Sequence, residues 1–193
     1  FLETEGTIAT GSLRRKAQWL HRYPSHNVVD LRGNVNLRLQ KLDYNNWGGA
    51  IFAKAGLERI DVLPENYIDL NWMVPAPAQG AVVVHTMKND KFTTEAVAKL
   101  NDNMTEVCTT VERQFLRELE GGCTAPIGAL ATIKNNELSF EGVLFSLDGE
   151  QKIEVTLENI QVSEVENLGK KCAQEILSNG GKELMQQIKA ELK

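Results

Sequence analysis

The sequence predicts an α/β domain followed by a small α+β domain. In the first half, apolar strand patterns at residues 7–9, 28–31 and 50–53 alternate with helix patterns. This β-α-β-α-β order is typical of a parallel sheet, which binds ligands at the carboxyl ends of its strands. In the second half, three strand patterns follow one another over residues 127–157 and precede two helix patterns. We therefore expect a three-stranded antiparallel sheet covered by helices in that half.

Two of the three helices expected in the first half follow residues that cap helices well. Ser12 precedes a helix pattern that extends to about Arg22, with Pro24 beyond its end. Asn34 precedes a second pattern with apolar side chains at helical spacing. A short helix over residues 55–60 follows the third strand. Each predicted strand therefore leads into a helix, as a βα repeat requires.

The middle of the chain has a different composition. Residues 63–80 contain three prolines and indicate a connection between regions. The run of small and β-branched residues at 81–84 predicts a buried strand. Helix patterns follow at about 93–101 and 104–119, and two glycines end the second of them.

Turn signals separate the strands of the second half. We expect strands over residues 127–133, 138–145 and 152–157, with turns at Asn135-Asn136 and Asp148-Gly149. The last two helix patterns cover residues 163–178 and 181–192.

Length and hydropathy limit the class of protein. With 193 residues, 42% of them hydrophobic, the chain can form one large domain or two small ones. It has no run of 18 apolar residues, so we expect no membrane-spanning helix and no membrane partner. The N-terminus lacks the basic flank and apolar core of a signal peptide. The chain also begins without Met, from which we expect a fragment of a longer protein; the alternative is that processing removes a Met.

The basic residues are concentrated in one segment. The net charge of −5 argues against nucleic acid as a partner. Residues 6–42 contain seven basic side chains and one acid, Asp30, and therefore carry +6, which leaves −11 for the rest of the chain. Five of the eight arginines lie in this segment. A local basic segment in an acidic protein indicates a small anionic ligand.

The cysteines and histidines predict no metal site. Cys108, Cys123 and Cys172 form no CxxC pair, and the three histidines lack metal-ligand spacing. An odd number of cysteines argues against a disulfide framework and is typical of a reducing cytoplasm. We therefore expect a cytoplasmic protein with at least one free or modified thiol.

Arginines occupy the starts of two helices. Arg14 and Arg15 directly follow the cap at Ser12, where a cation costs about 0.3–1 kcal/mol because the helix N-terminus is already positive. A bound anion would reverse that cost by accepting hydrogen bonds from the free N–H groups and the guanidinium groups. Arg32 repeats the arrangement at the next strand-to-helix junction, and Arg38 lies about one and a half turns further along that helix. The alternative is that these arginines pair with surface carboxylates.

Cys123 differs from the other two cysteines in its surroundings. It follows Gly121-Gly122 in a predicted loop, where a thiol can be exposed and covalently modified. The alternative is a small residue buried at a helix end. Cys108 and Cys172 lie in helix patterns, where a core position is the better interpretation.

Five segments follow one another in an order known from one protein family. They are residues 12–15, 31–39 with 41–43, 53–59, 75–81, and 112–116 with 119–123. In this order they resemble the porphobilinogen deaminases, and the similarity extends from about residue 6 to residue 145. The segment at 78–80 reads Ala-Gln-Gly where the family commonly has Gly-Gln-Gly.

The resemblance implies an enzyme that deaminates four porphobilinogen molecules and condenses them into hydroxymethylbilane in tetrapyrrole (heme) biosynthesis. It implies that Cys123 carries a dipyrromethane cofactor through a thioether bond. It also implies a cleft in which arginines bind the carboxylates of the cofactor, of porphobilinogen and of the growing polypyrrole. The implied contacts of this cleft are Thr10, Ser12, Arg14, Arg15, Arg32, Arg38, Ala53 and Gln79.

The resemblance also implies a domain organisation. Residues 1–74 would be part of a periplasmic-binding-protein-like α/β domain, and residues 101–193 the α+β domain that attaches the cofactor. Residues 75–100 would be a crossing strand and helix that belong to an N-terminal domain. The family's catalytic aspartate lies in that domain, so we expect no catalytic residue in this chain and no turnover by it alone. We expect the full-length enzyme to be a monomer.

A different class of protein is compatible with the first half alone. A β-α-β-α-β unit with clustered arginines could be a non-catalytic anion-binding module, such as half of a solute-binding or sensor protein. A dipyrromethane group on Cys123 would distinguish the enzyme from such a module.

Overall fold

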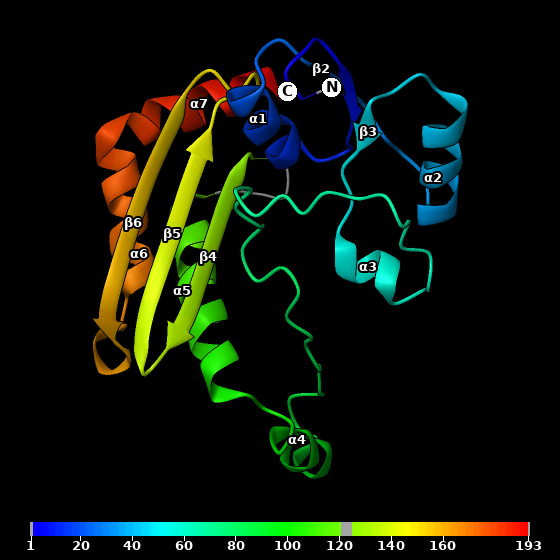
Figure 1. The fold of residues 1–193 in the computed structure, drawn as a ribbon. Helices are drawn as coiled ribbons and strands as arrows, with labels where there is room; N and C mark the ends of the chain where they lie inside the picture. Colours follow the sequence, from blue (N-terminus) through cyan, green and yellow to red (C-terminus); the bar gives the residue numbers. More distant parts are fainter. Residues whose placement is uncertain (1, 121–124, 193) are drawn as a thin grey trace.

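The computed structural model describes residues 2–120 and 125–192, and its first unit is built on a parallel sheet (Figure 1). Strand β1 (Thr7–Ala9) lies between β2 (Asn27–Val29) and β3 (Gly49–Ala50) and pairs in parallel with both. The predicted parallel order is therefore confirmed. Both edge strands are shorter than expected, because the chain leaves the ladder after Val29 and Ala50 to start the next helix.

A helix follows each of the three strands, as predicted, and the first two begin at the predicted capping residues. They are α1 (Leu13–Arg22), α2 (Val35–Tyr44) and the short α3 (Lys54–Glu58). The Ser12 side chain accepts a hydrogen bond from the Arg15 backbone N–H at 3.4 Å, and the Asn34 side chain accepts one from Leu37 at 2.9 Å. These bonds satisfy N–H groups that have no partner within the helix.

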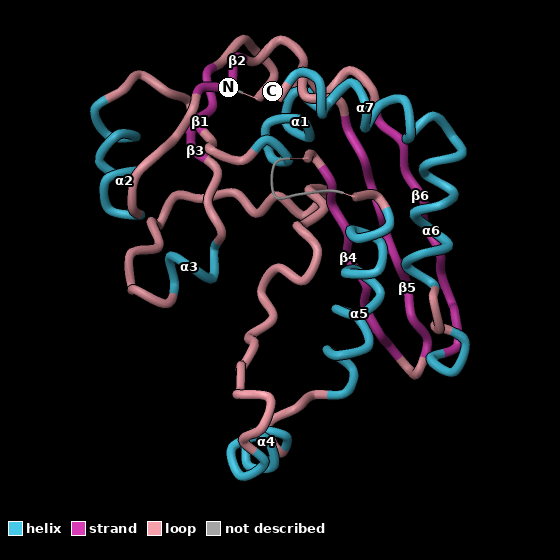
Figure 2. The backbone as a smooth tube through the Cα atoms, turned by 180° about the vertical axis from the view of Figure 1, so that it is seen from behind, coloured by secondary structure: helices cyan, strands magenta, loops and turns pink. Residues whose placement is uncertain are grey.

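The second unit is an antiparallel sheet with helices on one face (Figure 2). Its strands are β4 (Ile127–Lys134), β5 (Glu137–Phe145) and β6 (Lys152–Gln161), in that order. The helices that pack on this sheet are α5 (Asn103–Glu118), α6 (Leu168–Ile176) and α7 (Lys182–Glu191). The predicted antiparallel sheet covered by helices is confirmed.

The turns of this sheet and the start of α6 depend on left-handed residues. Asn135 and Asn136 have φ values of 52° and 62°, as the tight turn between β4 and β5 requires. Gly149 has φ 79° in the turn before β6. The helix expected from residue 163 begins only at Leu168, because a 3₁₀ turn covers Val162–Glu164 and Asn167 is left-handed, with φ 56°.

The predicted strand at residues 81–84 is wrong. Val82, Val83 and Val84 are 81%, 52% and 56% exposed and belong to no strand. A strand needs a neighbour for its backbone hydrogen bonds, and this segment pairs with no strand among the described residues. Helix α4 (Lys91–Ala98) follows, buries none of its residues, and lies apart from both sheets (Figure 1).

Helix α1 joins the two units. Val143 and Phe145 of β5 face away from α5–α7 and form a cluster with Ala17 of α1 and with Val74. The fit is close at Gly149, where an added Cβ would lie 2.4 Å from the Ala17 carbonyl oxygen. The first unit therefore covers one end of the sheet face that the helices of the second unit leave open.

Candidate functional site

A cavity of about 430 Å³ lies where the start of α1, the turn at residues 76–79 and the start of β4 meet. Its lining residues carry guanidinium, hydroxyl and amide groups as well as apolar side chains. Its lining residues are Thr10, Gly11, Ser12, Arg14, Arg15, Arg38, Ala76, Pro77, Gln79, Leu116, Ala125 and Ile127. Six of the nine predicted site residues are thus brought to one cavity, although they come from distant parts of the sequence.

Arg14 is the most deeply placed of these arginines. Its Nη1 donates to the Val74 carbonyl at 2.5 Å, and its Nη2 donates to Gln79 Oε1 at 3.2 Å. Only 8% of the residue is exposed. Burial, together with the neighbouring charge of Arg15, lowers the pKa of Arg14 to about 10. Both acceptors of this guanidinium group are neutral, so neither compensates its positive charge.

Arg15 and Arg38 add positive charge to the same cavity. Arg15 Nη1 donates to the Ile51 carbonyl at 3.1 Å, and Arg38 Nε donates to the Gly33 carbonyl at 2.7 Å. Burial and the charge of Arg38 lower the pKa of Arg15. None of the ion pairs formed by residues 2–120 and 125–192 involves Arg14, Arg15 or Arg38. The cavity is therefore electropositive and suited to a ligand with carboxylate groups.

Three predicted site residues are not part of this cavity's described lining. The Arg32 side chain is 74% exposed and pairs with Asp30 at 2.9 Å, which is the surface pairing considered as the alternative. Ala53 lines the neighbouring cavity. Cys123 lies outside the described residues.

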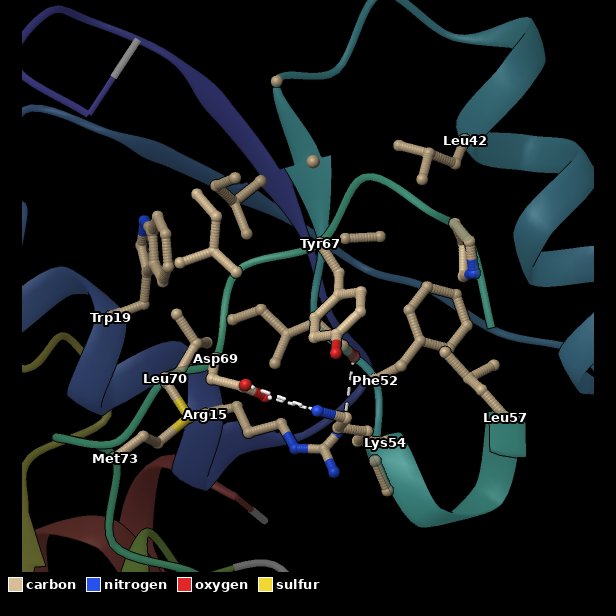
Figure 3. A pocket seen from close by; sticks show the side chains of 18 of the residues that line it. Arg15, Trp19, Leu42, Phe52, Lys54, Leu57, Tyr67, Asp69, Leu70 and Met73 are labelled. Carbon is tan, nitrogen blue, oxygen red and sulfur yellow. Dashed lines mark hydrogen bonds and ion pairs between the residues drawn. The ribbon is translucent and has the colours of Figure 1, made fainter. Parts of the chain in front are cut away.

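A second, larger cavity of about 660 Å³ adjoins the first (Figure 3). Arg14, Arg15 and Gln79 line both cavities. The second one is bordered mainly by aromatic and aliphatic side chains and by a mutually paired Lys54 and Asp69, 3.3 Å apart. Of the predicted site residues, Arg14, Arg15, Ala53 and Gln79 line this cavity. Its aromatic residues were not predicted as a site, because they are scattered along the sequence and lack any period.

The sequence did not predict a role for one buried carboxylate near the first cavity. Glu112 on α5 accepts hydrogen bonds from the backbone N–H groups of Ala78, at 2.5 Å, and Ala131, at 2.8 Å. Burial raises the pKa of Glu112. The resemblance includes this residue, but no pattern in the sequence indicates its partners.

Comparison with protein families shows where this chain belongs. Residues 2–95 match the family model described as "Porphobilinogen deaminase, dipyromethane cofactor binding domain", and residues 106–178 match "Porphobilinogen deaminase, C-terminal domain". The chain belongs to the porphobilinogen deaminase family. The two matches divide it between the parallel-sheet unit with its connection and the antiparallel unit.

Sequence identity to individual porphobilinogen deaminases supports this assignment. The chain is 37% identical to the protein of Chlorobium phaeobacteroides over 97% of its own length and 62% of the relative. It is 39% identical to the protein of Thermus thermophilus, over 94% of this chain and 61% of the relative. It is 37% identical to the protein of Moorella thermoacetica, over 98% of this chain and 61% of the relative. The chain thus spans about three fifths of these relatives. Within the part that the structure describes, no helix is long and apolar enough to cross a membrane.

Proposed function

We propose that this chain supplies the carboxylate-binding cavity and the cofactor cysteine of a cytoplasmic porphobilinogen deaminase. This enzyme condenses four porphobilinogen molecules into hydroxymethylbilane during tetrapyrrole biosynthesis. One observation carries the proposal: three guanidinium groups line one cavity, and no carboxylate of the described residues pairs with them. Each porphobilinogen brings two carboxylates, which would compensate these charges.

The residues around the cavity fit a dipyrromethane cofactor held by Cys123 through a thioether bond. Ala125, two positions after Cys123 in the sequence, lines the cavity together with the arginines. When bound, the cofactor supplies the pyrrole to which porphobilinogen units are added. The cavity's three guanidinium groups would compensate three of its four carboxylates.

The arginines would act by binding and orientation. Arg14 is held on two sides by Val74 and Gln79, so its orientation is fixed before a ligand arrives. Arg15 and Arg38 each donate one hydrogen bond to a backbone carbonyl and would share carboxylates with Arg14 through their other N–H groups. Arg32 would bind an outer carboxylate, because its exposed ion pair with Asp30 contributes little and exchanges easily.

The remaining proposed contacts are uncharged. Thr10, Ser12 and Gln79 place hydroxyl and amide groups in the cavity, and Ala53 lines the adjoining one. We assign these residues to binding, and we assign no acid–base role to a residue of this chain.

We also propose the domain organisation implied by the resemblance. Residues 1–74 would belong to a periplasmic-binding-protein-like domain and residues 101–193 to the cofactor-attachment domain. Residues 75–100 would form a crossing segment that docks on a further domain. The exposed Val82–Val84 run and the exposed Phe92 support this role, since apolar side chains of this size are usually covered.

Binding of porphobilinogen by two matched variants tests the function. Arg15→Gln and Lys16→Gln each remove one positive charge from the same turn of α1, but only Arg15 lines the cavity. By calorimetry at fixed ionic strength, Arg15→Gln should weaken binding about tenfold or more, the loss expected for a charged hydrogen bond. Lys16→Gln should change it little. Equal effects, or no binding by the unmodified chain, would refute the proposal.

The mass of the Cys123 peptide provides an independent check of the cofactor. Attachment of two linked pyrroles should increase the mass of this peptide, and a Cys123→Ser variant should lack the increase. Modification of Cys108 or Cys172 instead would contradict the assignment.

A further inference from the structure

Glu112 is a buried carboxylate that holds two backbone segments together. It lies on α5, is 5% exposed, and forms none of the ion pairs among the described residues. Its Oε1 accepts from Ala131 of β4, and its Oε2 accepts from Ala78 in the turn at residues 76–79. A buried carboxylate without a cation costs free energy unless hydrogen bonds satisfy it, and here two backbone N–H groups do so.

The turn that Glu112 holds is strained at the bonded residue. Ala78 has φ 59°, in the left-handed region that disfavours a residue with a Cβ. The next residue, Gln79, directs Oε1 to Arg14 Nη2 at 3.2 Å and to the Ala76 N–H at 3.2 Å. Two hydrogen bonds and the peptide bond between Ala78 and Gln79 therefore link Glu112 to the guanidinium group of Arg14.

We propose that Glu112 is a positioning residue: it fixes the 76–79 turn so that Gln79 holds Arg14 in the orientation that binds a ligand carboxylate. This inference deepens the proposed function and rests on it for the identity of the ligand. The link between Glu112 and the orientation of Arg14 stands on the described contacts alone.

The role requires a carboxylate in particular. Both Glu112 oxygens accept from backbone N–H groups, and a glutamine at this position can offer only one acceptor oxygen. Its NH₂ group would face a backbone N–H, so one of the two segments would be released. Glu112→Gln thus removes one bond at nearly constant shape and is expected to fold.

Chemical modification of arginine tests the link without any ligand. We compare the rates at which cyclohexanedione modifies Arg14 and Arg15 in the unmodified chain, in Glu112→Gln and in Glu112→Ala, by mass spectrometry of peptides. The Arg14 rate should rise about two- to tenfold, the factor that corresponds to one lost hydrogen bond. The Arg15 rate should stay constant, because its partner is the Ile51 carbonyl. A general loss of structure would raise both rates together.

Porphobilinogen binding provides the second measurement. Glu112→Gln should weaken binding about two- to tenfold by the same reasoning. The control is Glu106→Gln, which alters an exposed carboxylate on the same helix whose side-chain partner is Asn101. It should leave both the Arg14 rate and the affinity unchanged.

The outcomes separate this inference from the proposed function. If the unmodified chain fails to bind porphobilinogen but the Arg14 rate rises selectively in Glu112→Gln, the function is refuted and the positioning role is supported. If Arg14 and Arg15 rates are unchanged, or rise in parallel, the positioning role is overturned whatever the affinity.

Discussion

The guanidinium group of Arg14 donates a hydrogen bond to the carbonyl of Val74, sixty positions away in the sequence, at 2.5 Å. The same Val74 packs its side chain against Val143 and Phe145 of the antiparallel sheet. Val74 therefore connects the arginine-lined cavity to the contact between the two units. A change in that contact is expected to alter the position of Arg14.

Gln18 completes the hydrogen bonding of Val74. It donates to the Val74 carbonyl at 2.9 Å and accepts from the Val74 N–H at 2.8 Å, and both groups are buried. Gln18→Ala should lower the free energy of unfolding by about 1–3 kcal/mol, because it leaves a buried N–H without a partner. Urea unfolding measures the change. Gln174→Ala, at an exposed glutamine of α6, should stay within about 0.5 kcal/mol, and an equal loss in both variants would argue against a specific role of Gln18.

Polycarboxylates should stabilise the protein against heat. Buried guanidinium groups that repel one another favour a bound anion, and the charges of Arg14 and Arg15 act on each other in this way. A ligand at a hundred times its Kd adds about 2.7 kcal/mol to the free energy of unfolding. Citrate or porphobilinogen should raise Tm more than chloride at the same ionic strength. An identical effect of chloride would show that screening alone is responsible.

Relief of backbone strain at Ala78 should stabilise the chain. Ala78 has φ 59°, and the Ala78→Gly variant lacks the Cβ that makes this left-handed conformation unfavourable. Its free energy of unfolding should rise by about 0.5–1 kcal/mol. Ala76→Gly changes a residue of the same turn that is not left-handed and should destabilise or have no effect. Thermal unfolding of the two variants compares them. Greater stabilisation by Ala76→Gly would contradict the assigned strain.

The thiol of Cys172 should react only when the chain unfolds. Burial first, and then the charge of Glu175, raises its pKa to about 11 from 9.0. At pH 8 its thiolate fraction is therefore about a hundredfold below that of an unfolded thiol. Iodoacetamide labelling should be slow in buffer and fast in urea. Fast labelling in both would contradict the burial.

The same shift has a consequence for stability. The folded state keeps the Cys172 proton to higher pH than the unfolded state does. The contribution of this thiol to stability is thus complete below pH 9 and is lost as the pH rises from about 9 to about 11. A Cys172→Ala variant should lack this part of the pH dependence in unfolding experiments between pH 8 and pH 10.5.

Sequence patterns predicted the elements that are stabilised locally. The caps at Ser12 and Asn34, the turn at Asn135-Asn136 and the period of the strands at 127–145 depend on residues close to one another in the chain. The strand expected at 81–84 failed for the opposite reason, because a strand needs a distant partner that its own sequence does not specify.

By itself, the sequence determined that this is a βα unit followed by an antiparallel unit, with arginines at the starts of two helices. The tertiary structure decided which arginines share a cavity: Arg38 joins Arg14 and Arg15, whereas Arg32 turns outward to Asp30. It also decided the partners of Glu112. Capping and periodicity act over a few residues, but the direction of a side chain depends on packing between segments that only the folded chain brings together.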